Sequence, residues 1–220
     1  MIQENYRTIA SQLRKPTGDL GKQVGEMMNK GNRLMNLATV KQLEPEPYDK
    51  ILEIGMGNGC FVKNILGNHK TIRYTGCDFS ETMIKEARLW NEDFVQSGQA
   101  QFTEASTDML PYGNEAFNKI FTVNTIYFWD NTTAVLTEIR RVLKQNGLLI
   151  ISLRPKSIMN VLPVTQYGFK TFSKQDCIEL LTKNGFHKVE VIEETDHVIK
   201  MFGEEYKNAF MIVKAIKNHL

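Results

Sequence analysis

The sequence of 220 residues lacks the features that mark several specialised classes of protein. It has only three cysteines, Cys60, Cys77 and Cys177, which lie far apart and form no C-x-x-C pair. This spacing favours reduced thiols over a disulfide framework or a zinc site, as is typical of the cytoplasm. No apolar run reaches the roughly 18 residues of a membrane span, and the first residues lack the apolar core of a signal peptide. We therefore expect a cytoplasmic protein without a metal site or membrane partner.

Charge and histidine are also sparse. The chain carries 27 basic and 25 acidic residues, for a net charge of +2, and four histidines. A nucleic-acid-binding domain shows a strong basic excess, so we expect no nucleic-acid partner. The sequence shows no Ser-His-Asp, Cys-His or metal-ligand grouping. Its length and its apolar content of 42% suit a globular fold with a sizeable core.

The most informative segment, residues 51–61, reads I-L-E-I-G-M-G-N-G-C-F. Its apolar start suits a strand that is buried on both faces, as in a parallel sheet. Gly55, Gly57 and Gly59 then allow a tight turn and a close approach of the backbone to a ligand. Helical spacing follows from Cys60 onward. This succession of strand, glycine turn and helix indicates a nucleotide-type binding site.

Position 60 separates two classes of ligand. The dinucleotide fingerprint G-x-G-x-x-G requires a glycine where this chain has Cys60. The pattern from Glu53 to Gly59, E-x-G-x-G-x-G, instead resembles motif I of the class I S-adenosylmethionine (SAM)-dependent methyltransferases. Within that class, residues 49 to about 155 resemble the type 11 group. SAM has a sulfonium and an amino-acid tail but no phosphate. A carboxylate at Glu53 suits that cation, so we expect SAM as the cofactor, with Met56 also in the binding turn.

The alternation of strand-like and helix-like segments after residue 49 predicts an α/β fold with helices on both faces of the sheet. Strands are expected at residues 50–54, 72–77, 100–104, 119–123, 148–153, 187–193 and 209–216, and helices at 60–66, 81–96, 133–143 and 174–183. The last two strands are joined by a short polar turn at Gly203, so they should pair antiparallel at the sheet edge. The expectation is a Rossmann-like, seven-stranded, mostly parallel sheet with an antiparallel last strand. This ending is similar to the class I methyltransferase sheet and unlike an NAD-binding sheet.

Residues 1–48 are expected to form an N-terminal helical lid and linker, and residues 49–220 the methyltransferase domain. Apolar residues from Leu20 to Ala38 follow the rhythm of an amphipathic helix. The run Glu44-Pro45-Glu46-Pro47 then enforces an extended linker. This helix either packs on the sheet for stability or covers the SAM pocket and lines the acceptor site. Residues 14–18 and 27–32 resemble the N-terminal region of bacterial family members.

Asp78 directly follows the second predicted strand. A carboxylate at that position can accept hydrogen bonds from both ribose hydroxyls of an adenosine, whereas the alternative is a helix cap. Ser80 offers a separate cap for the next helix, which leaves Asp78 for the ribose. Phe79 and Met83 could then pack on the adenine.

Residues 102–112, F-T-E-A-S-T-D-M-L-P-Y, resemble a family segment with an acidic residue four positions before the leucine. That residue accepts from the adenine amino group, and here Ser106 occupies its place. A serine oxygen can accept the same bond, but more weakly because it carries no charge. Ser106 and Thr107 are therefore expected near the adenine, and Asp108 is expected to point elsewhere.

The segment after the fourth strand, residues 122–131, should lie at the methionine end of SAM, because ligands sit at the carboxyl ends of parallel strands. Asn124 and Thr125 are expected to contact SAM. Tyr127 and Trp129 either pack in the core or line the pocket, where an aromatic face would favour a sulfonium. Arg154 could bind an acidic acceptor or lie in a solvated turn. If the acceptor needs deprotonation, Tyr127 is the candidate base.

Methyl transfer from SAM is an in-line displacement, in which the protein mainly positions the reactants. The resemblance predicts a SAM-dependent methyltransferase that acts on a small-molecule acceptor, as a monomer or homodimer. Two alternatives stay open. One is a non-catalytic SAM-binding protein, since Ser106 departs from the family pattern. The other is an NAD(P)-dependent oxidoreductase, which Cys60 and the terminal hairpin disfavour.

Overall fold

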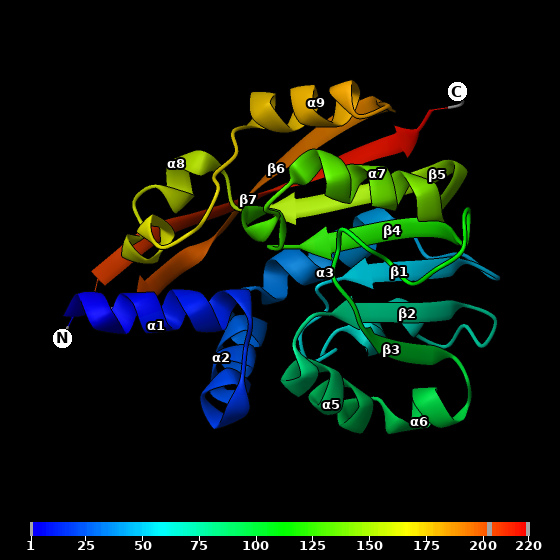
Figure 1. Ribbon diagram of the computed structural model, residues 1–220, viewed down its shortest axis with the longest axis horizontal. Coiled ribbons are helices and arrows are strands. Elements are labelled where there is room, and N and C mark those ends of the chain that lie inside the picture. The colour runs from blue at the N-terminus through cyan, green and yellow to red at the C-terminus, as the bar shows by residue number, and fades with distance from the viewer. Residues whose placement is uncertain (1, 202–203, 219–220) are drawn as a thin grey trace.

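The computed structural model describes residues 2–201 and 204–218. Within them, seven strands form one sheet in the order β3-β2-β1-β4-β5-β7-β6 (Figure 1). The strands are β1 (Lys50–Ile54), β2 (Arg73–Asp78), β3 (Ala100–Glu104), β4 (Phe117–Val123), β5 (Leu143–Leu153), β6 (Phe186–Met201) and β7 (Glu204–Lys217). β1 to β5 run parallel, whereas β7 runs antiparallel to both β5 and β6. The predicted fold class is confirmed.

Helices cover both faces of the sheet. They are α1 (Ile2–Arg14), α2 (Gly18–Gly31), α3 (Arg33–Leu43), α4 (Val62–Leu66), α5 (Glu81–Trp90), α6 (Glu92–Gln96), α7 (Thr132–Val142), α8 (Lys156–Met159) and α9 (Lys174–Lys183), with 3-10 turns η1 (Ile126–Phe128) and η2 (Pro163–Gln166). Successive strand residues face opposite sides. Leu52 and Ile54 accordingly pack with α7 and α9, while Ile51 packs with α3, α4 and α5. Both faces of β1 are therefore buried.

The N-terminal segment differs from its prediction as a single helix. It forms α1, α2 and α3, and α2 and α3 are separated at Asn32, whose backbone leaves the helical region with φ −109 and ψ 8. The helix α1 was not predicted. Figure 1 shows α1 and α2 beyond the carboxyl ends of the central strands. The division into a lid and a catalytic domain stays a prediction.

Four further elements have bounds that differ clearly from the prediction. The helix expected over 81–96 breaks at Asn91, whose side-chain amide donates to the carbonyls of Gly59 and Ala87 and so ties the break to the glycine turn. The strand predicted at residues 148–153 begins earlier, at Leu143, so that Asn146, with φ +58, lies within β5. β6 and β7 are longer than predicted. The turn predicted at Gly203 lies outside the described residues.

Candidate functional site

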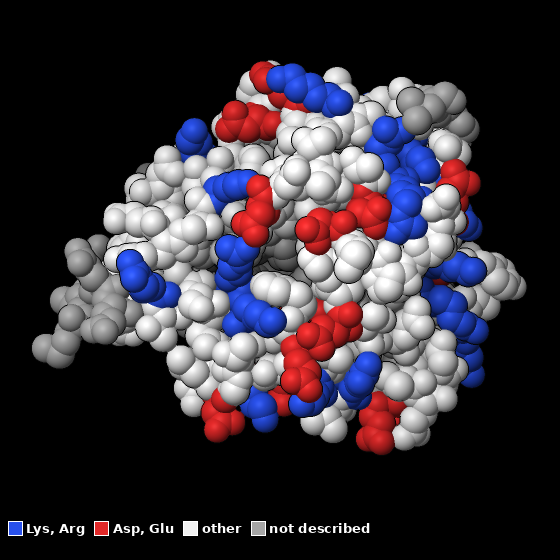
Figure 2. Space-filling view, in the orientation of Figure 1, with Lys and Arg blue, Asp and Glu red and all other residues white. Residues whose placement is uncertain are grey.

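A cavity of about 360 Å³ lies at the carboxyl ends of β1, β2 and β4. Its floor is the glycine turn after β1, its sides are the segments that follow β2, β3 and β4, and α1 to α3 supply the opposite wall. Figure 2 shows this face hollowed near its centre, with both basic and acidic side chains around the hollow. The cavity therefore lies where open α/β sheets bind their ligands.

Most of the residues predicted for the site line this cavity. They are Glu53, Gly55, Met56, Gly57, Asp78, Phe79, Ser106, Thr107, Asn124, Thr125 and Trp129. Gly59, Met83, Tyr127 and Arg154 do not line it. The segments after four separate strands thus converge on one space, although they lie up to 76 residues apart, from Glu53 to Trp129.

The glycine turn contacts its neighbours closely. Gly55 has φ +70, and a Cβ there would lie 2.3 Å from Cγ2 of Thr125. Gly57 has φ +58, and a Cβ there would meet no atom within 4 Å. Gly59 packs on α5 instead, where a Cβ would lie 3.2 Å from that of Ala87. Gly59 is therefore needed for packing beneath the turn, while Gly57 faces the open cavity.

Asp78 is buried at the tip of β2 and faces the turn. Its Oδ2 accepts from the backbone N–H of Gly57 at 3.1 Å and its Oδ1 from that of Ser80 at 2.9 Å. Burial raises the pKa of Asp78 to about 6, against the lowering effect of these backbone donors. Ser80 caps α5 by accepting from the Met83 N–H at 3.2 Å, as predicted. Each Asp78 oxygen keeps acceptor capacity for a ligand hydroxyl.

Glu53 is a second buried carboxyl group in the cavity wall. The Tyr74 hydroxyl donates to its Oε2 at 2.6 Å. Burial raises the pKa of Glu53 to about 8, the Tyr74 hydrogen bond lowers it, and the nearby charge of Asp78 raises it. Neither carboxyl group forms an ion pair with a buried cation among residues 2–201 and 204–218, and two such buried groups favour a positively charged ligand.

The raised pKa of Glu53 predicts a pH dependence of stability. Folding favours the protonated group, so its contribution is present below the ordinary pKa of 4.5 and is lost as pH rises through about 8. We expect the ligand-free protein to lose on the order of 2 kcal/mol of unfolding free energy between pH 6 and 9. Glu53→Gln should lose much less, because its side chain does not titrate. Urea unfolding at both pH values measures this, and equal losses in the two proteins would contradict it.

The far end of the cavity carries Phe79, Ser106 and Thr107. Contrary to our expectation, Asp108 also lines it and accepts a hydrogen bond from the Ser106 hydroxyl. The amino group of Lys15 lies 5.2 Å from the Phe79 ring centroid, within cation–π range. A carboxylate therefore lies beside Ser106, two residues after the position where the family segment places one.

Met83 does not reach this end of the cavity. Its side chain is fully buried beneath α2, and a Cβ on Gly25 would lie 3.3 Å from Met83 Cε. The prediction that Met83 contacts the adenine is not supported, because the packing of α2 on α5 encloses the side chain.

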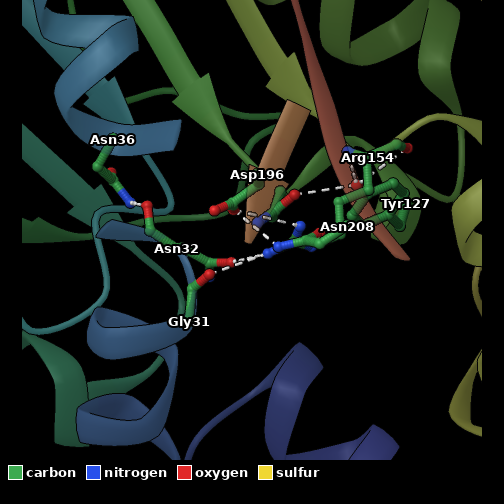
Figure 3. A network of polar contacts seen from close by, with 8 residues as sticks. Gly31, Asn32, Asn36, Tyr127, Arg154, Asp196 and Asn208 are labelled. Atoms are coloured by element: carbon green, nitrogen blue, oxygen red, sulfur yellow. Dashed lines mark hydrogen bonds and ion pairs between the residues drawn. The ribbon is translucent and has the colours of Figure 1, made fainter. Parts of the chain in front are cut away.

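Tyr127 and Arg154 lie behind the wall. Tyr127 is buried at 3% exposure, and burial raises the pKa of its hydroxyl well above the ordinary value. This contradicts its expected role as a base. The Arg154 guanidinium donates from Nη2 to the Gly31 carbonyl and to Asn32 Oδ1, both at 3.0 Å (Figure 3). It anchors the α2–α3 junction and does not line the acceptor wall.

The segment at residues 155–172, which follows Arg154, also lies outside the cavity lining. No residue of that segment lines the cavity, and Phe169 packs against Phe128 with ring centroids 4.6 Å apart. The wall facing β4 comes instead from α2 and α3, through Met28, Asn29, Asn32 and Asn36. Helical spacing placed these residues on a helix but gave no sign of which face would meet the cavity.

An ion pair joins the two sides of the cavity. Arg14, at the end of α1, donates from Nη2 to Asp130 Oδ2 at 2.8 Å, and both residues line the cavity. The two side chains are 41% and 84% exposed, so the pair contributes at most about 1 kcal/mol to stability. The pair neutralises both charges at this part of the wall.

Within residues 2–201 and 204–218, no helix is long and apolar enough to cross a membrane. The same residues contain no grouping of three histidine, cysteine, aspartate or glutamate side chains that could hold a metal ion.

Comparisons with known proteins give a consistent family. Residues 52–151 match the family described as a methyltransferase domain. An O-methyltransferase of Pyrenophora dematioidea is 27% identical over 186 residues, which cover 81% of this chain and 69% of that protein. A demethylmenaquinone methyltransferase of Corynebacterium kroppenstedtii is 28% identical over 118 residues, or 54% of this chain and 47% of that protein.

Solved structures of methyltransferases have the same fold as this chain. A SAM-dependent methyltransferase from Thermotoga maritima superposes with a TM-score of 0.64 at 25% identity, covering 88% of this chain and 94% of that chain. A chain from a Haloferax volcanii complex of a methyltransferase with its Trm112 activator has a TM-score of 0.77 at 16% identity, covering 97% and 98%. Residues 52–151 thus match a methyltransferase domain, and the glycine turn, the buried carboxylates and the related proteins support a class I SAM-dependent methyltransferase with SAM as its cofactor.

Proposed function

We propose that this methyltransferase acts on a small-molecule acceptor in the cytoplasm. The observation that carries the proposal is the enclosure of the cavity by the chain's own α1 to α3. Met28 and Asn29 of α2 line it together with Phe128 and Trp129, and the Arg14–Asp130 ion pair joins two segments of its wall. Such a partly apolar, walled space suits a small ligand. The related proteins named O-methyltransferase and demethylmenaquinone methyltransferase support the same class.

The sheet order sets the proposed direction of the cofactor. Ser106, which follows β3, would meet the adenine, and Asp78 at the tip of β2 the ribose. The methionine part would then extend over β1 and β4, between Glu53 and Asn124. The acceptor would enter on the β4 side, beside Phe128 and Trp129.

In the proposed reaction an acceptor atom attacks the methyl carbon in line with the carbon–sulfur bond. That bond breaks, its electron pair goes to sulfur, and S-adenosylhomocysteine leaves. The acceptor's proton passes to water. The chain contributes by binding and orienting both molecules and by excluding water under α1 to α3.

Methyl-labelled SAM incubated with the protein and a small-metabolite extract tests the proposal. We expect label in a low-molecular-weight product with the wild-type chain and none with heat-inactivated protein. Tight SAM binding without any labelled product would favour the non-catalytic alternative. Label only in macromolecules would contradict a small acceptor. Sedimentation of the same sample would test the expected monomer or homodimer.

A further inference from the structure

Asn124 holds an unusual backbone conformation where the chain leaves β4 and lines the cavity. Its φ of +58 lies in the left-handed region, which asparagine tolerates better than most residues. Its N–H donates to the Ser152 carbonyl at 2.8 Å, which ties the turn after β4 to β5. Its side chain lines the cavity. The backbone therefore fixes where this amide lies.

Tyr127 determines which end of the amide faces the cavity. The Tyr127 hydroxyl accepts from the backbone N–H of Arg154, so its own proton is left to donate. Asn124 Oδ1 lies at 2.9 Å from the Tyr127 hydroxyl oxygen and the Arg154 carbonyl oxygen at 3.4 Å, so Asn124 is the closer acceptor. Tyr127 does not line the cavity, so its hydrogen bond holds Asn124 Oδ1 on the side of the wall away from the cavity. The Nδ2 group is then the end of the amide that faces the cavity.

A second hydrogen-bond donor lies in the same wall. Among the described residues, Trp129 Nε1 is one of the few buried side-chain atoms with no hydrogen-bond partner. Trp129 is 3% exposed and lines the cavity beside Phe128. A buried N–H without a partner is costly, and a ligand oxygen would satisfy it. Within the part of the chain that the structure describes, the wall near Asn124 therefore holds a second, buried N–H that has no protein partner.

We propose that Tyr127 is a positioning residue that holds the Asn124 amide with its N–H groups toward the methyl-transfer end, and that the acceptor is an oxygen acid: a phenol, an enol or a carboxylic acid. This inference rests on the proposed function. Donors at this end stabilise the oxygen of an acid that has lost its proton to water. An oxygen lone pair forms the new O–CH₃ bond as the carbon–sulfur bond breaks.

Titration of SAM and S-adenosylhomocysteine tests the orientation without a known acceptor. Asn124→Asp replaces the N–H donor at the methyl-transfer end, near the proposed position of the sulfonium, with a carboxylate of the same shape. Because only SAM carries the sulfonium charge, we expect the preference for SAM over S-adenosylhomocysteine to rise at least tenfold. Tyr127→Phe releases the amide, so its oxygen can turn to the sulfonium, and the preference should rise about threefold. A merely structural role would weaken both ligands equally.

Asn131→Asp is the matched control. Asn131 also lines the cavity, and its Oδ1 caps α7 by accepting from the Ala134 N–H at 3.1 Å, a role that aspartate can keep. This variant adds the same charge at a different place, and the preference should change less than twofold.

An unchanged preference in Asn124→Asp, with both ligands still bound, would overturn the inference and leave the proposed function intact. If that variant does not fold, an unchanged preference in Tyr127→Phe has the same meaning. Failure of the wild-type protein to bind either ligand would overturn the proposed function itself. The labelled product decides the acceptor class: a methyl ether or ester is expected, and a methyl group on nitrogen, sulfur or carbon would contradict an oxygen acid.

Discussion

Asp78→Asn should weaken SAM binding at least 100-fold while leaving the fold intact. At the proposed ribose site, the substitution removes two hydrogen bonds from ribose hydroxyls to charged oxygens, each worth about 1.5–3 kcal/mol. A loss of about 1.4 kcal/mol corresponds to a tenfold change in affinity. The amide also has one acceptor oxygen where the carboxylate has two, although the Gly57 and Ser80 N–H groups each need one. Calorimetric titration with SAM measures the loss.

Asp108→Asn is the control for charge. Asp108 lines the same cavity but is exposed, and it meets Ser106 at the opposite end from Glu53. We expect its SAM affinity to fall less than about fivefold, because exposed charges interact weakly. Equal losses in the two variants would mean that the ribose does not lie on Asp78.

Alanine at two positions of the glycine turn should separate binding from stability. At Gly57 the new methyl group meets no atom within 4 Å and enters the cavity. The positive φ costs about 1–2 kcal/mol, so the fold should survive while SAM affinity falls at least tenfold. The reason is that the backbone can no longer approach the ligand closely.

At Gly55 the same substitution carries the φ cost and also overlaps Thr125 Cγ2, which would lie 2.3 Å away. Overpacking adds about 1–3 kcal/mol, so we expect a loss of about 2–5 kcal/mol in the free energy of unfolding. Urea unfolding of Gly55→Ala and Gly57→Ala side by side measures the difference. If Gly57→Ala had a lower free energy of unfolding than Gly55→Ala, that result would contradict the geometry of the turn.

The parts of the fold that follow local patterns could be predicted from the sequence. β1 and β3 have the bounds expected from their apolar runs, and α9 those expected from its spacing. The position of Asp78 beside the glycine turn could be predicted because Asp78 directly follows the second predicted strand. In the structure, parallel pairing of Ile54 with Cys77 brings the tip of β2 next to the turn after β1. Local chemistry and sheet topology suffice for these features.

The rest depends on packing between distant segments. Met83 lies on α5 at a position that could face the cavity, but α2 covers it. Tyr127 was expected in the pocket, yet the turn η1 directs its side chain into the core. Which face of α2 and α3 meets the cavity depends on Arg154, 122 residues beyond Asn32, and no local pattern reports that contact.

The most direct test is a titration of the wild-type chain with SAM, S-adenosylhomocysteine and NAD in the same calorimetric experiment. Cys60 in place of the third dinucleotide glycine, and two buried carboxyl groups beside the turn, predict binding of the first two ligands and no detectable heat from NAD. Binding of NAD without binding of SAM would contradict the account.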